Sequence, residues 1–284
     1  MARHMAIYRA DKQHGVAWIT GGGTGMGYQL ALDLARDGWT VAVTSLTENP
    51  VEPGAEIETP GLPGKILQYH CDVTDEAAMA AVVEAIERQT GPIVLAVFNA
   101  GIYIPVHGQA LAIADFRRTY EVNLFGVLNG LAPVVPRMQE RGRGHVVINA
   151  SVSSYLGWPS AAAYGSSKAA LNNMAESLRY DFERMNIRIQ VVNPGFVDTP
   201  LIENINYRMP ALVTVEQAGA QIARAIRSGG YETAFPRRLA WTLNFLRLWP
   251  RDLAFAFMKY ATRKLRRSPI PGASRTRSAR KRPG

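Results

Sequence analysis

Cysteine is nearly absent from this chain, since Cys71 is the one cysteine among 284 residues. A lone thiol excludes an internal disulfide and a metal site made of several cysteines. Histidine is scarce as well, and the histidines show no metal-ligand spacing; they are His4, His14, His70, His107 and His145. We expect no bound metal, and we expect Cys71 to be a small buried residue.

Long apolar runs are also missing. No stretch of eighteen or more apolar residues occurs, which excludes a simple membrane-spanning helix. The first fifteen residues lack an apolar stretch of signal-peptide length and carry charges at Arg3, Arg9, Asp11 and Lys12. We expect an N-terminal arm, residues 1–14, and a location in the cytoplasm or an equivalent reducing compartment.

Acidic residues are absent from the end of the chain. Residues 263–284 contain nine Lys or Arg and no Asp or Glu. Since the whole chain has 32 basic and 23 acidic residues, the remainder holds 23 of each and is neutral. The net charge of +9 therefore belongs to the tail, and a groove for specific nucleic-acid binding is not expected. Residues 269–284 are predicted to form a basic, disordered tail.

Strand-length apolar segments alternate with helix-length segments over residues 15–234. The predicted strands are 16–20, 40–44, 67–71, 93–98, 145–149 and 187–192. Four helices are predicted, from after Gly25 to about Arg36 and over residues 75–89, 115–141 and 162–185. The third is expected to have an adjustment of its helical geometry near Pro133 and Pro136. Residues 46–64 hold four prolines and three glycines, so no regular helix is expected there. This order predicts one α/β domain, a doubly wound, Rossmann-like parallel sheet with helices on both faces.

A glycine-rich turn follows the first predicted strand. Its spacing is Gly-x-x-x-Gly-x-Gly, at Gly21, Gly25 and Gly27. Glycines at a strand-to-helix turn let backbone amides approach a phosphate, and the helix N-terminus adds partial positive charge. Such a turn can also serve close packing alone. We favour a dinucleotide site whose first residues are Gly21, Gly23, Thr24, Gly25, Met26 and Gly27.

A second motif points to proton transfer. Tyr164 and Lys168 are four residues apart in a predicted helix and share a face, and Ser151 lies thirteen residues before Tyr164. A nearby ammonium group stabilises phenolate, so Lys168 is expected to lower the pKa of Tyr164 towards a useful range. Taken alone, a Tyr–Lys pair on a helix is common. Serine-hydrolase chemistry is not favoured, because no histidine or acid stands out as a partner for Ser151.

The motifs together resemble the short-chain dehydrogenase/reductase family over roughly residues 15–230. The matching residues occur in the family's order; they are Thr20-Gly21-x-x-x-Gly25-x-Gly27, Asn99-Ala100-Gly101, Asn123, Ser151, Tyr164-x-x-x-Lys168 and Pro194-Gly195. The resemblance implies that Tyr164 is the general acid/base, that Lys168 also holds the ribose, that Ser151 orients the substrate oxygen and that Asn123 supports a proton relay through water. One position departs from the pattern, since Phe98 replaces the first of two asparagines often found before Ala-Gly.

The resemblance also implies further cofactor contacts. Asp72 and Val73 are expected at the adenine, Asn99, Ala100 and Gly101 beside the cofactor, and Pro194, Gly195, Val197 and Thr199 around the nicotinamide. Family members commonly pair through helices that correspond to residues 115–141 and 163–185. A homodimer or homotetramer is therefore expected.

The residue that ends the second strand bears on the choice between NADP and NAD. An acidic side chain there would accept hydrogen bonds from the ribose and repel a 2′-phosphate. By resemblance this position is Ser45, which favours NADP. NAD stays open, because no Arg or Lys is adjacent and acidic residues follow in the next loop, at Glu48, Glu52, Glu56 and Glu58.

Apolar side chains gather where the family's substrate cleft opens. They are Tyr103, Ile104, Tyr155, Leu156, Trp158, Phe196, Leu201, Ile202, Ile205, Tyr207, Met209 and Leu212. These residues predict a small apolar carbonyl or alcohol substrate. The competing interpretation is that many of them only pack the loop against the core.

Residues 235–268 are predicted to form an amphipathic helical extension beyond the family core. Apolar and aromatic residues recur there among cations, a pattern that suits two helices lying on an anionic membrane surface through residues 237–267. Such a contact would be peripheral, on the inner face of a membrane. Cover of the substrate cleft or a subunit interface explains the pattern equally well.

The sequence thus predicts an NAD(P)-dependent oxidoreductase that interconverts an alcohol and a ketone or aldehyde. Reduction with NADPH is the favoured direction. One alternative is a non-catalytic, NAD(P)-sensing protein whose C-terminus binds a membrane or a partner. Another is an isomerase or dehydratase that uses the same cofactor fold.

Overall fold

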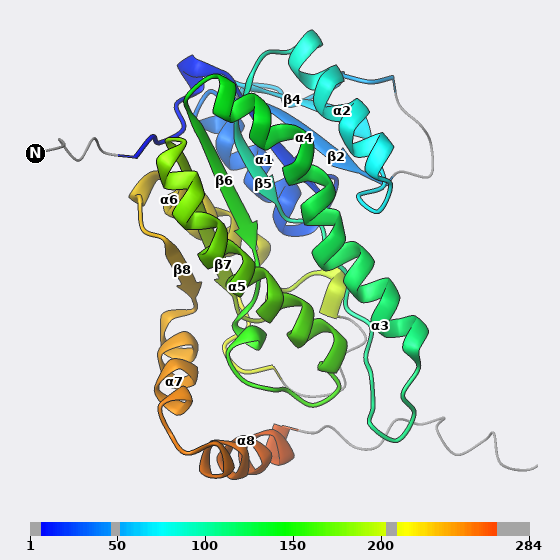
Figure 1. Ribbon diagram of the computed structural model, residues 1–284, viewed down its shortest axis with the longest axis vertical. Coiled ribbons are helices and arrows are strands. Elements are labelled where there is room, and N and C mark those ends of the chain that lie inside the picture. The colour runs from blue at the N-terminus through cyan, green and yellow to red at the C-terminus, as the bar shows by residue number, and fades with distance from the viewer. Residues whose placement is uncertain (1–6, 47–51, 203–208, 266–284) are drawn as a thin grey trace, which may run out of the picture.

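The computed structural model describes residues 7–46, 52–202 and 209–265. Over these residues the chain forms an eight-stranded sheet in the order β3-β4-β2-β1-β5-β6-β7-β8 (Figure 1). Neighbouring strands are parallel except β3 and β4. The strands are β1 Val16–Thr20, β2 Thr40–Ser45, β3 Ala55–Ile57, β4 Lys65–His70, β5 Ile93–Phe98, β6 Gly144–Asn149, β7 Ile187–Pro194 and β8 Glu232–Phe235. The predicted doubly wound α/β fold is confirmed.

Helices cover both faces of the sheet. They are α1 Gly25–Arg36, α2 Glu76–Gln89, α3 Ile113–Tyr120, α4 Gly126–Glu140, α5 Ala162–Arg184, α6 Val215–Ser228, α7 Arg237–Arg247 and α8 Arg251–Leu265. Leu30 and Leu34 of α1 pack with Ile222 and Ile226 of α6 over one face. The other face is covered by α2, α4 and α5, whose buried side chains include Met79, Leu131 and Leu171.

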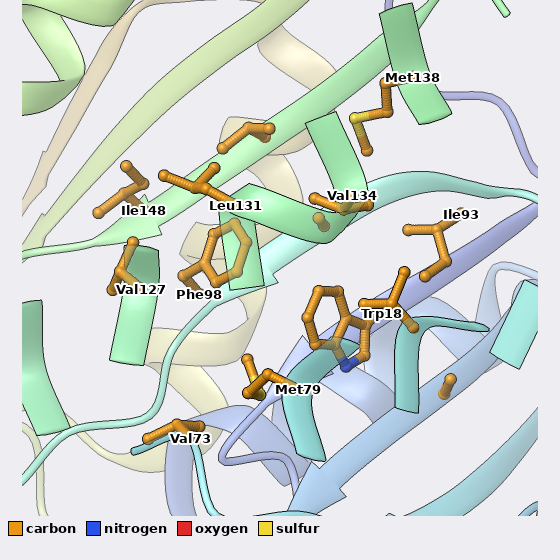
Figure 2. Close-up of a cluster of buried hydrophobic side chains, with 14 of the residues drawn as sticks. Trp18, Val73, Met79, Ile93, Phe98, Val127, Leu131, Val134, Met138 and Ile148 are labelled. Atoms are coloured by element: carbon orange, nitrogen blue, oxygen red, sulfur yellow. The ribbon is translucent and has the colours of Figure 1, made fainter. Parts of the chain in front are cut away.

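The central strands are apolar along their whole length because both of their faces are covered. All six residues of β5 are buried. Trp18 of β1 meets Phe98 of β5 edge to face, with ring centroids 5.6 Å apart (Figure 2). The Trp18 indole N–H donates to the Thr44 hydroxyl at 3.2 Å, so this large side chain is buried without an unpaired donor.

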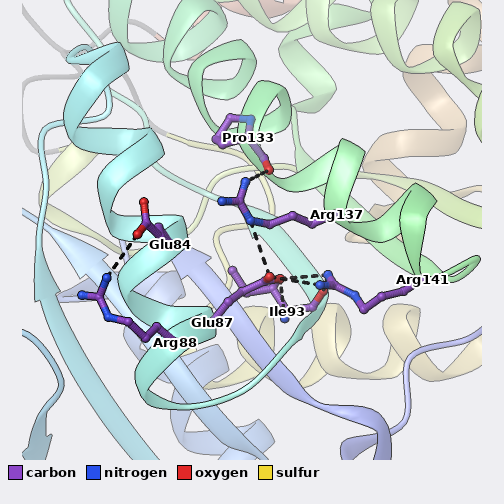
Figure 3. Close-up of polar contacts among 7 residues, drawn as sticks. All are labelled: Glu84, Glu87, Arg88, Ile93, Pro133, Arg137 and Arg141. Atoms are coloured by element: carbon purple, nitrogen blue, oxygen red, sulfur yellow. Dashed lines mark hydrogen bonds and ion pairs between the residues drawn. The ribbon is translucent and has the colours of Figure 1, made fainter.

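The long helix predicted over 115–141 is divided, but not at its prolines. A π-helical turn, η2 Glu121–Phe125, separates α3 from α4, whereas Pro133 and Pro136 lie inside α4. Contacts to α2 hold this part of α4: Glu87 pairs with Arg137 at 3.5 Å and with Arg141 at 2.8 Å (Figure 3). Tertiary contacts therefore keep the proline-containing helix continuous, and the predicted place of the adjustment was wrong.

Two other predictions about local structure can be compared with the fold. The region 46–64 has no helix in its described part and instead contributes the antiparallel edge strand β3. Cys71 is buried, as predicted, and burial beside Asp72 and Asp75 raises the pKa of its thiol to about 11.

The N-terminal arm packs on the sheet domain over its described residues. Arg188 of β7 donates to the backbone carbonyls of Ile7 and Tyr8, each at 2.9 Å. The amide of Ala10 donates to Nδ1 of His145 at 3.4 Å. These bonds fix the arm to β6 and β7.

The C-terminal extension consists of α7 and α8, which follow β8. It lies beyond the carboxyl ends of the strands, at the end of the molecule far from the N-terminus (Figure 1). Leu243, Leu246 and Met258 pack there with Val152 and Tyr155 of the segment after β6. Among the described helices, none has the length and hydropathy needed to cross a membrane.

Candidate active site

The predicted site residues come together where the strand order reverses, between β1 and β5. In doubly wound sheets ligands bind at this switch point, outside the carboxyl ends of the strands. Two adjoining hollows lie there. We call the first the glycine cleft; its lining includes Gly21, Gly23, Thr24, Gly25, Met26, Ser45, Asp72, Val73, Asn99, Ala100, Gly101 and Thr199. We call the second the tyrosine pocket; it is lined by Ser151, Tyr164, Lys168, Pro194, Gly195, Val197 and Thr199, among others.

The glycine turn requires its glycines. Gly21 and Gly25 have φ angles of +63° and +55°, which side chains other than glycine rarely adopt. A Cβ at Gly23 would lie 2.6 Å from the hydroxyl oxygen of Ser45, and a Cβ at Gly27 would overlap the carbonyl of Gly21. Gly27 lines neither hollow, so it serves the packing of the turn.

The N-terminus of α1 is open towards the glycine cleft. Thr24 is the N-cap residue, and its side chain makes no capping hydrogen bond. Thr24 and Met26 both line the cleft. Free amides at a helix N-terminus attract anions, so this end of α1 fits a phosphate group.

Asn99 ties the glycine turn to the neighbouring strands. Its side-chain amide donates to the carbonyls of Thr20 at 3.3 Å and Gly21 at 3.0 Å, and its oxygen accepts from Asn149 Nδ2 at 2.9 Å. The residue before it, Phe98, points into the core and packs against Trp18. The departure at Phe98 therefore leaves these Asn99 contacts in place.

Ser45 and Asp72 also line the glycine cleft, and Ser45 lies beside Gly23 of the turn. The Ser45 hydroxyl is buried and has no hydrogen-bond partner among the described residues. The pKa of Asp72 is lowered. Burial by itself would raise this pKa, but hydrogen bonds from Thr74 and the charges of Arg118 and His70 stabilise the carboxylate more strongly. Arg118 of α3 also lines the cleft, and it was not predicted because it belongs to none of the motifs quoted above.

Ser151, Tyr164 and Lys168 meet in the tyrosine pocket. Ser151 follows β6, and its hydroxyl donates to the Pro194 carbonyl at 3.3 Å. Lys168 is buried and its ammonium group donates to the Asn149 carbonyl at 2.8 Å, while it lies 5.7 Å from the centre of the Tyr164 ring. The i, i+4 spacing on α5 thus places both side chains in one pocket.

Burial controls the titration of the two α5 side chains. Burial raises the pKa of Tyr164 to about 12. The neighbouring Tyr103 raises this pKa further, whereas a hydrogen bond with Ser151 lowers it. Burial also lowers the pKa of Lys168 to about 8. The expected lowering of the Tyr164 pKa by Lys168 is not found for the protein alone, because desolvation of the phenolate dominates and Ser151, not Lys168, is the group that opposes it.

Asn123 is fully buried in the π-helical turn η2. Its amide donates to the Ile102 carbonyl at 3.0 Å and the Ser167 hydroxyl at 3.1 Å, and its oxygen accepts from the Ile102 amide at 2.8 Å. The side chain therefore braces the segment after β5 against α5. Asn123 lines neither the glycine cleft nor the tyrosine pocket.

Aromatic and apolar side chains form the remaining walls of the tyrosine pocket. Trp158 meets Phe196 edge to face at 5.5 Å, and Tyr103 meets Tyr164 in the same way at 5.3 Å. Leu201 lines both hollows. Of the other predicted lining residues, Tyr155 and Leu156 lie outside the pocket lining, and residues 203–208 fall outside the described part of the chain.

The described residues contain no group of three or more His, Cys, Asp or Glu side chains that could hold a metal ion. What the site offers is an anion-binding turn beside a hydroxyl, a phenol and an amine. Such a set can bind a phosphate-bearing cofactor and transfer a proton to or from an oxygen atom.

Comparisons with known proteins agree with this geometry. A family described as short chain dehydrogenase matches residues 15–209. An uncharacterized oxidoreductase of Myxococcus xanthus is 31% identical over 265 residues, which cover 90% of this chain and 100% of that protein. The 3-oxoacyl-[acyl-carrier-protein] reductase FabG of Thermotoga maritima is 33% identical over 190 residues, 67% of this chain and 77% of that protein. A short chain dehydrogenase from Burkholderia cenocepacia, crystallised with NADP, superposes with a TM-score of 0.71 at 25% identity, covering 86% of this chain and 97% of that one.

Proposed function

Because this chain belongs to the short-chain dehydrogenase/reductase family and is an NAD(P)-dependent oxidoreductase, we propose that it interconverts an apolar alcohol and its carbonyl compound with NADP(H). Reduction is the favoured direction. The observation that carries the proposal is the meeting of Ser151, Tyr164 and Lys168 in an apolar pocket that adjoins the glycine cleft.

The residues of the glycine cleft fit NADP. The glycine turn and the open N-terminus of α1 would hold the pyrophosphate, Asp72 and Val73 the adenine, and Lys168 the nicotinamide ribose. Asn99, Ala100 and Gly101 would line the cofactor's path, and Pro194, Gly195, Val197 and Thr199 would surround the nicotinamide. The unpartnered hydroxyl of Ser45 could donate to a 2′-phosphate, and no carboxylate stands at that position to repel it. The Burkholderia relative was crystallised with NADP, which supports the same choice here.

When bound, the cofactor supplies or accepts the hydride, and the protein's own residues handle the oxygen. In reduction the Tyr164 hydroxyl donates its proton to the substrate oxygen. Ser151 donates a hydrogen bond to the same oxygen by giving up its 3.3 Å bond to Pro194. Lys168, beside the Tyr164 ring, favours the phenolate that remains. Asn123 supports this arrangement by fixing α5 to the segment after β5.

The substrate is proposed to be apolar around its carbonyl group. Trp158, Phe196 and Leu201 offer it little hydrogen bonding, whereas Ser151 and Tyr164 converge from one wall. The Thermotoga relative is named for 3-oxoacyl substrates, which combine a ketone with an apolar chain. This supports a chain-like ketone for the present protein.

Two further parts of the sequence prediction stay proposals. A homodimer or homotetramer through residues 115–141 and 163–185 is supported by exposed apolar side chains at Phe125 of η2 and Leu128 of α4. A cytoplasmic location, with peripheral contact to the inner face of a membrane, is supported by the single free cysteine and by the charge of the C-terminal extension.

The function is tested by titrating the purified protein with NADPH and NADH while nicotinamide fluorescence is followed. Apolar ketones of increasing chain length are then added and the loss of nicotinamide absorbance is recorded. Tight NADPH binding with ketone-dependent oxidation is expected. Binding of neither cofactor by folded protein would refute the proposal. Cofactor binding without turnover of any ketone, or of its alcohol with NADP, would favour the non-catalytic sensing protein instead.

A further inference from the structure

The two helices of the C-terminal extension each have a second apolar stripe that faces away from the core. In α7 the buried side chains are Ala240, Leu243 and Leu246. Trp241, Phe245 and Leu248 lie on the opposite side at spacing i, i+4, i+7, and they are 66%, 60% and 81% exposed. These side chains do not take part in the core of the protein.

The same spacing recurs in α8. Its buried side chains are Ala254, Met258 and Thr262, whereas Leu253, Phe257 and Tyr260 are 57%, 42% and 60% exposed. Since both stripes follow i, i+4, i+7, each forms one ridge along its helix. Exposed single apolar residues are ordinary on protein surfaces, but a ridge of large side chains on each of two successive helices is not.

Trp249, between the two helices, connects the ridges. Its ring centre lies 5.9 Å from that of Phe245 and 6.1 Å from that of Phe257. The ridges and Trp249 therefore form one continuous surface across α7 and α8, which we call the apolar face. Aromatic side chains make up most of it.

Positively charged side chains lie on both helices of the extension, and two of them border the apolar face on α7. Arg237 and Arg238 lie beside the α7 ridge, and the guanidinium of Arg237 stacks over the Trp241 ring at 5.2 Å. Arg251, Lys259 and Arg263 are exposed on α8, where they line the groove beside residues 156–159. Residues 237–265, the described part of the extension, contain seven Lys or Arg and one acid, Asp252. The surface thus combines aromatic side chains with a strong excess of cations.

We propose that the apolar face docks this protein on the surface of an anionic lipid bilayer. Aromatic side chains insert at the boundary between headgroups and acyl chains, while arginines and lysines pair with the lipid phosphates. A second copy of this chain fits less well, because a symmetric contact would place the same cations against one another. A bilayer with anionic headgroups neutralises them.

Docking in this way would bring the tyrosine pocket close to the bilayer. Trp158 lines the tyrosine pocket and also a groove that continues between residues 156–159 and α8, where Phe255 and Met258 contribute. An apolar ketone dissolved in the membrane would then have a short path to Ser151 and Tyr164. This consequence rests on the proposed oxidoreductase activity, whereas the docking rests on the apolar face and its cations and deepens the peripheral membrane contact proposed above.

The proposal is tested by vesicle flotation of the full chain without cofactor or substrate. Vesicles of phosphatidylcholine with added phosphatidylglycerol are compared with vesicles of phosphatidylcholine alone. We expect tighter partition to the anionic vesicles, by about tenfold or more. F245S and F257S should each reduce that partition several-fold, and so should the pair R237E and R238E. The matched control R88E, on α2, should leave it unchanged, and so should Y180S, at a tyrosine 74% exposed on α5, with light scattering used to check that its oligomeric state matches that of the wild type.

Several outcomes would overturn the proposal. One is failure of the folded wild-type protein to float with anionic vesicles, folding being checked by circular dichroism. A second is equal loss of partition in Y180S and F245S, which would make the contact unspecific. A third is a smaller oligomer for F245S in light scattering with unchanged vesicle binding, which would make the face an interface between copies. Because no turnover is measured, failure of the docking is distinguishable from failure of the proposed oxidoreductase activity.

Discussion

The side-chain oxygen of Asn193 accepts a hydrogen bond of 3.0 Å from the backbone amide of Ser151, so β7 holds in place the serine that follows β6. The side-chain nitrogen of Asn193, Nδ2, donates at 2.8 Å to the carboxylate of Glu232, at the start of β8. The Tyr155 hydroxyl donates to the same carboxylate. Arg247 of α7 stacks over the Tyr155 ring at 5.4 Å. A chain of polar contacts therefore leads from the C-terminal extension to Ser151.

Glu232 is predicted to be a positioning residue for Ser151. Glu232→Ala removes the acceptor shared by Asn193 and Tyr155, and it should lower kcat several-fold with little change in KM for the cofactor. The loss of these bonds should reduce the free energy of unfolding by about 1–3 kcal/mol. Glu232→Gln keeps an oxygen acceptor and should restore most of kcat. Steady-state kinetics and urea unfolding of both variants check this, and equal kinetic defects in the two would contradict it.

Tyr164→Phe should lower kcat by about a hundredfold to ten thousandfold, because the group that donates the proton is lost. Cofactor affinity should stay near that of the wild type, since the ring remains in place. Tyr103→Phe is the matched control: its hydroxyl bonds to Ser160 at 3.0 Å and its ring meets that of Tyr164. It should retain most of the activity. Turnover by Tyr164→Phe at a rate close to that of the control would refute the proton-transfer role.

The features of this fold that could be predicted from the sequence are those set by residues close together along the chain. The runs of β1 and β5 are apolar because both sheet faces are covered, and the turn at Gly21 and Gly25 needs positive φ angles. The spacing of Tyr164 and Lys168 on one helix is local too. The resemblance to a family then placed distant residues, such as Asp72 and Thr199, around the same cleft.

The features that were missed depend on contacts between distant segments. The π-helical turn at Asn123 coincides with bonds to Ile102 and Ser167, which sequence spacing does not reveal. The bond between Asn193 and Ser151 joins residues 42 positions apart. The pKa of Tyr164 depends on how deeply the phenol is buried, so the direction of its shift could be found only once the fold was known.

His145 should make the protein more sensitive to acid. Burial lowers its pKa from 6.5 to about 3, and the Gln190 bond at 2.7 Å opposes this only in part. Since the pKa in the folded state lies below that in the unfolded state, the stabilisation is present above pH 6.5 and is lost as the pH falls towards 3. Between about pH 7 and pH 5 the wild type should lose about 2 kcal/mol more than His145→Gln.

Urea unfolding at both pH values measures this difference. His145→Gln should be the less stable protein at neutral pH, because the ring accepts from Ala10 and bonds to Gln190 in the buried interior. The control His107→Gln, at an exposed position, should follow the wild type at both pH values. Parallel behaviour of His145→Gln and the wild type would show that His145 does not titrate as described.

Ser45→Asp should reverse the preference for NADPH. A carboxylate at the end of β2 would repel the 2′-phosphate and could accept hydrogen bonds from the ribose of NADH. We expect the Kd for NADPH to rise by about tenfold or more, which corresponds to about 1.4 kcal/mol, and the Kd for NADH to stay equal or fall. Ser45→Asn, of the same size without the charge, is the control. Fluorescence titration of the wild type and both variants measures the six dissociation constants, and an unchanged NADPH Kd in Ser45→Asp would contradict the role of Ser45.

Trp158 is predicted to limit the length of the substrate. Its indole separates the tyrosine pocket from the groove beside α8, and its N–H is buried without a hydrogen-bond partner among the described residues. Trp158→Ala should join the two spaces, because the ring that packs on Phe196 is removed. The ratio of kcat/KM for long-chain over short-chain ketones should then rise by about tenfold, a value that reflects a few more buried methylene groups.

Trp158→Phe is the matched variant, since it keeps an aromatic wall and removes only the unpaired N–H. It should keep the wild-type ratio and be at least as stable, because no buried donor is left unpaired. A rise in the ratio for both variants would assign the effect to the lost N–H rather than to the opened path. No rise in either would mean that the substrate chain leaves the tyrosine pocket on another side, towards Leu201 and the glycine cleft, where the two hollows also adjoin.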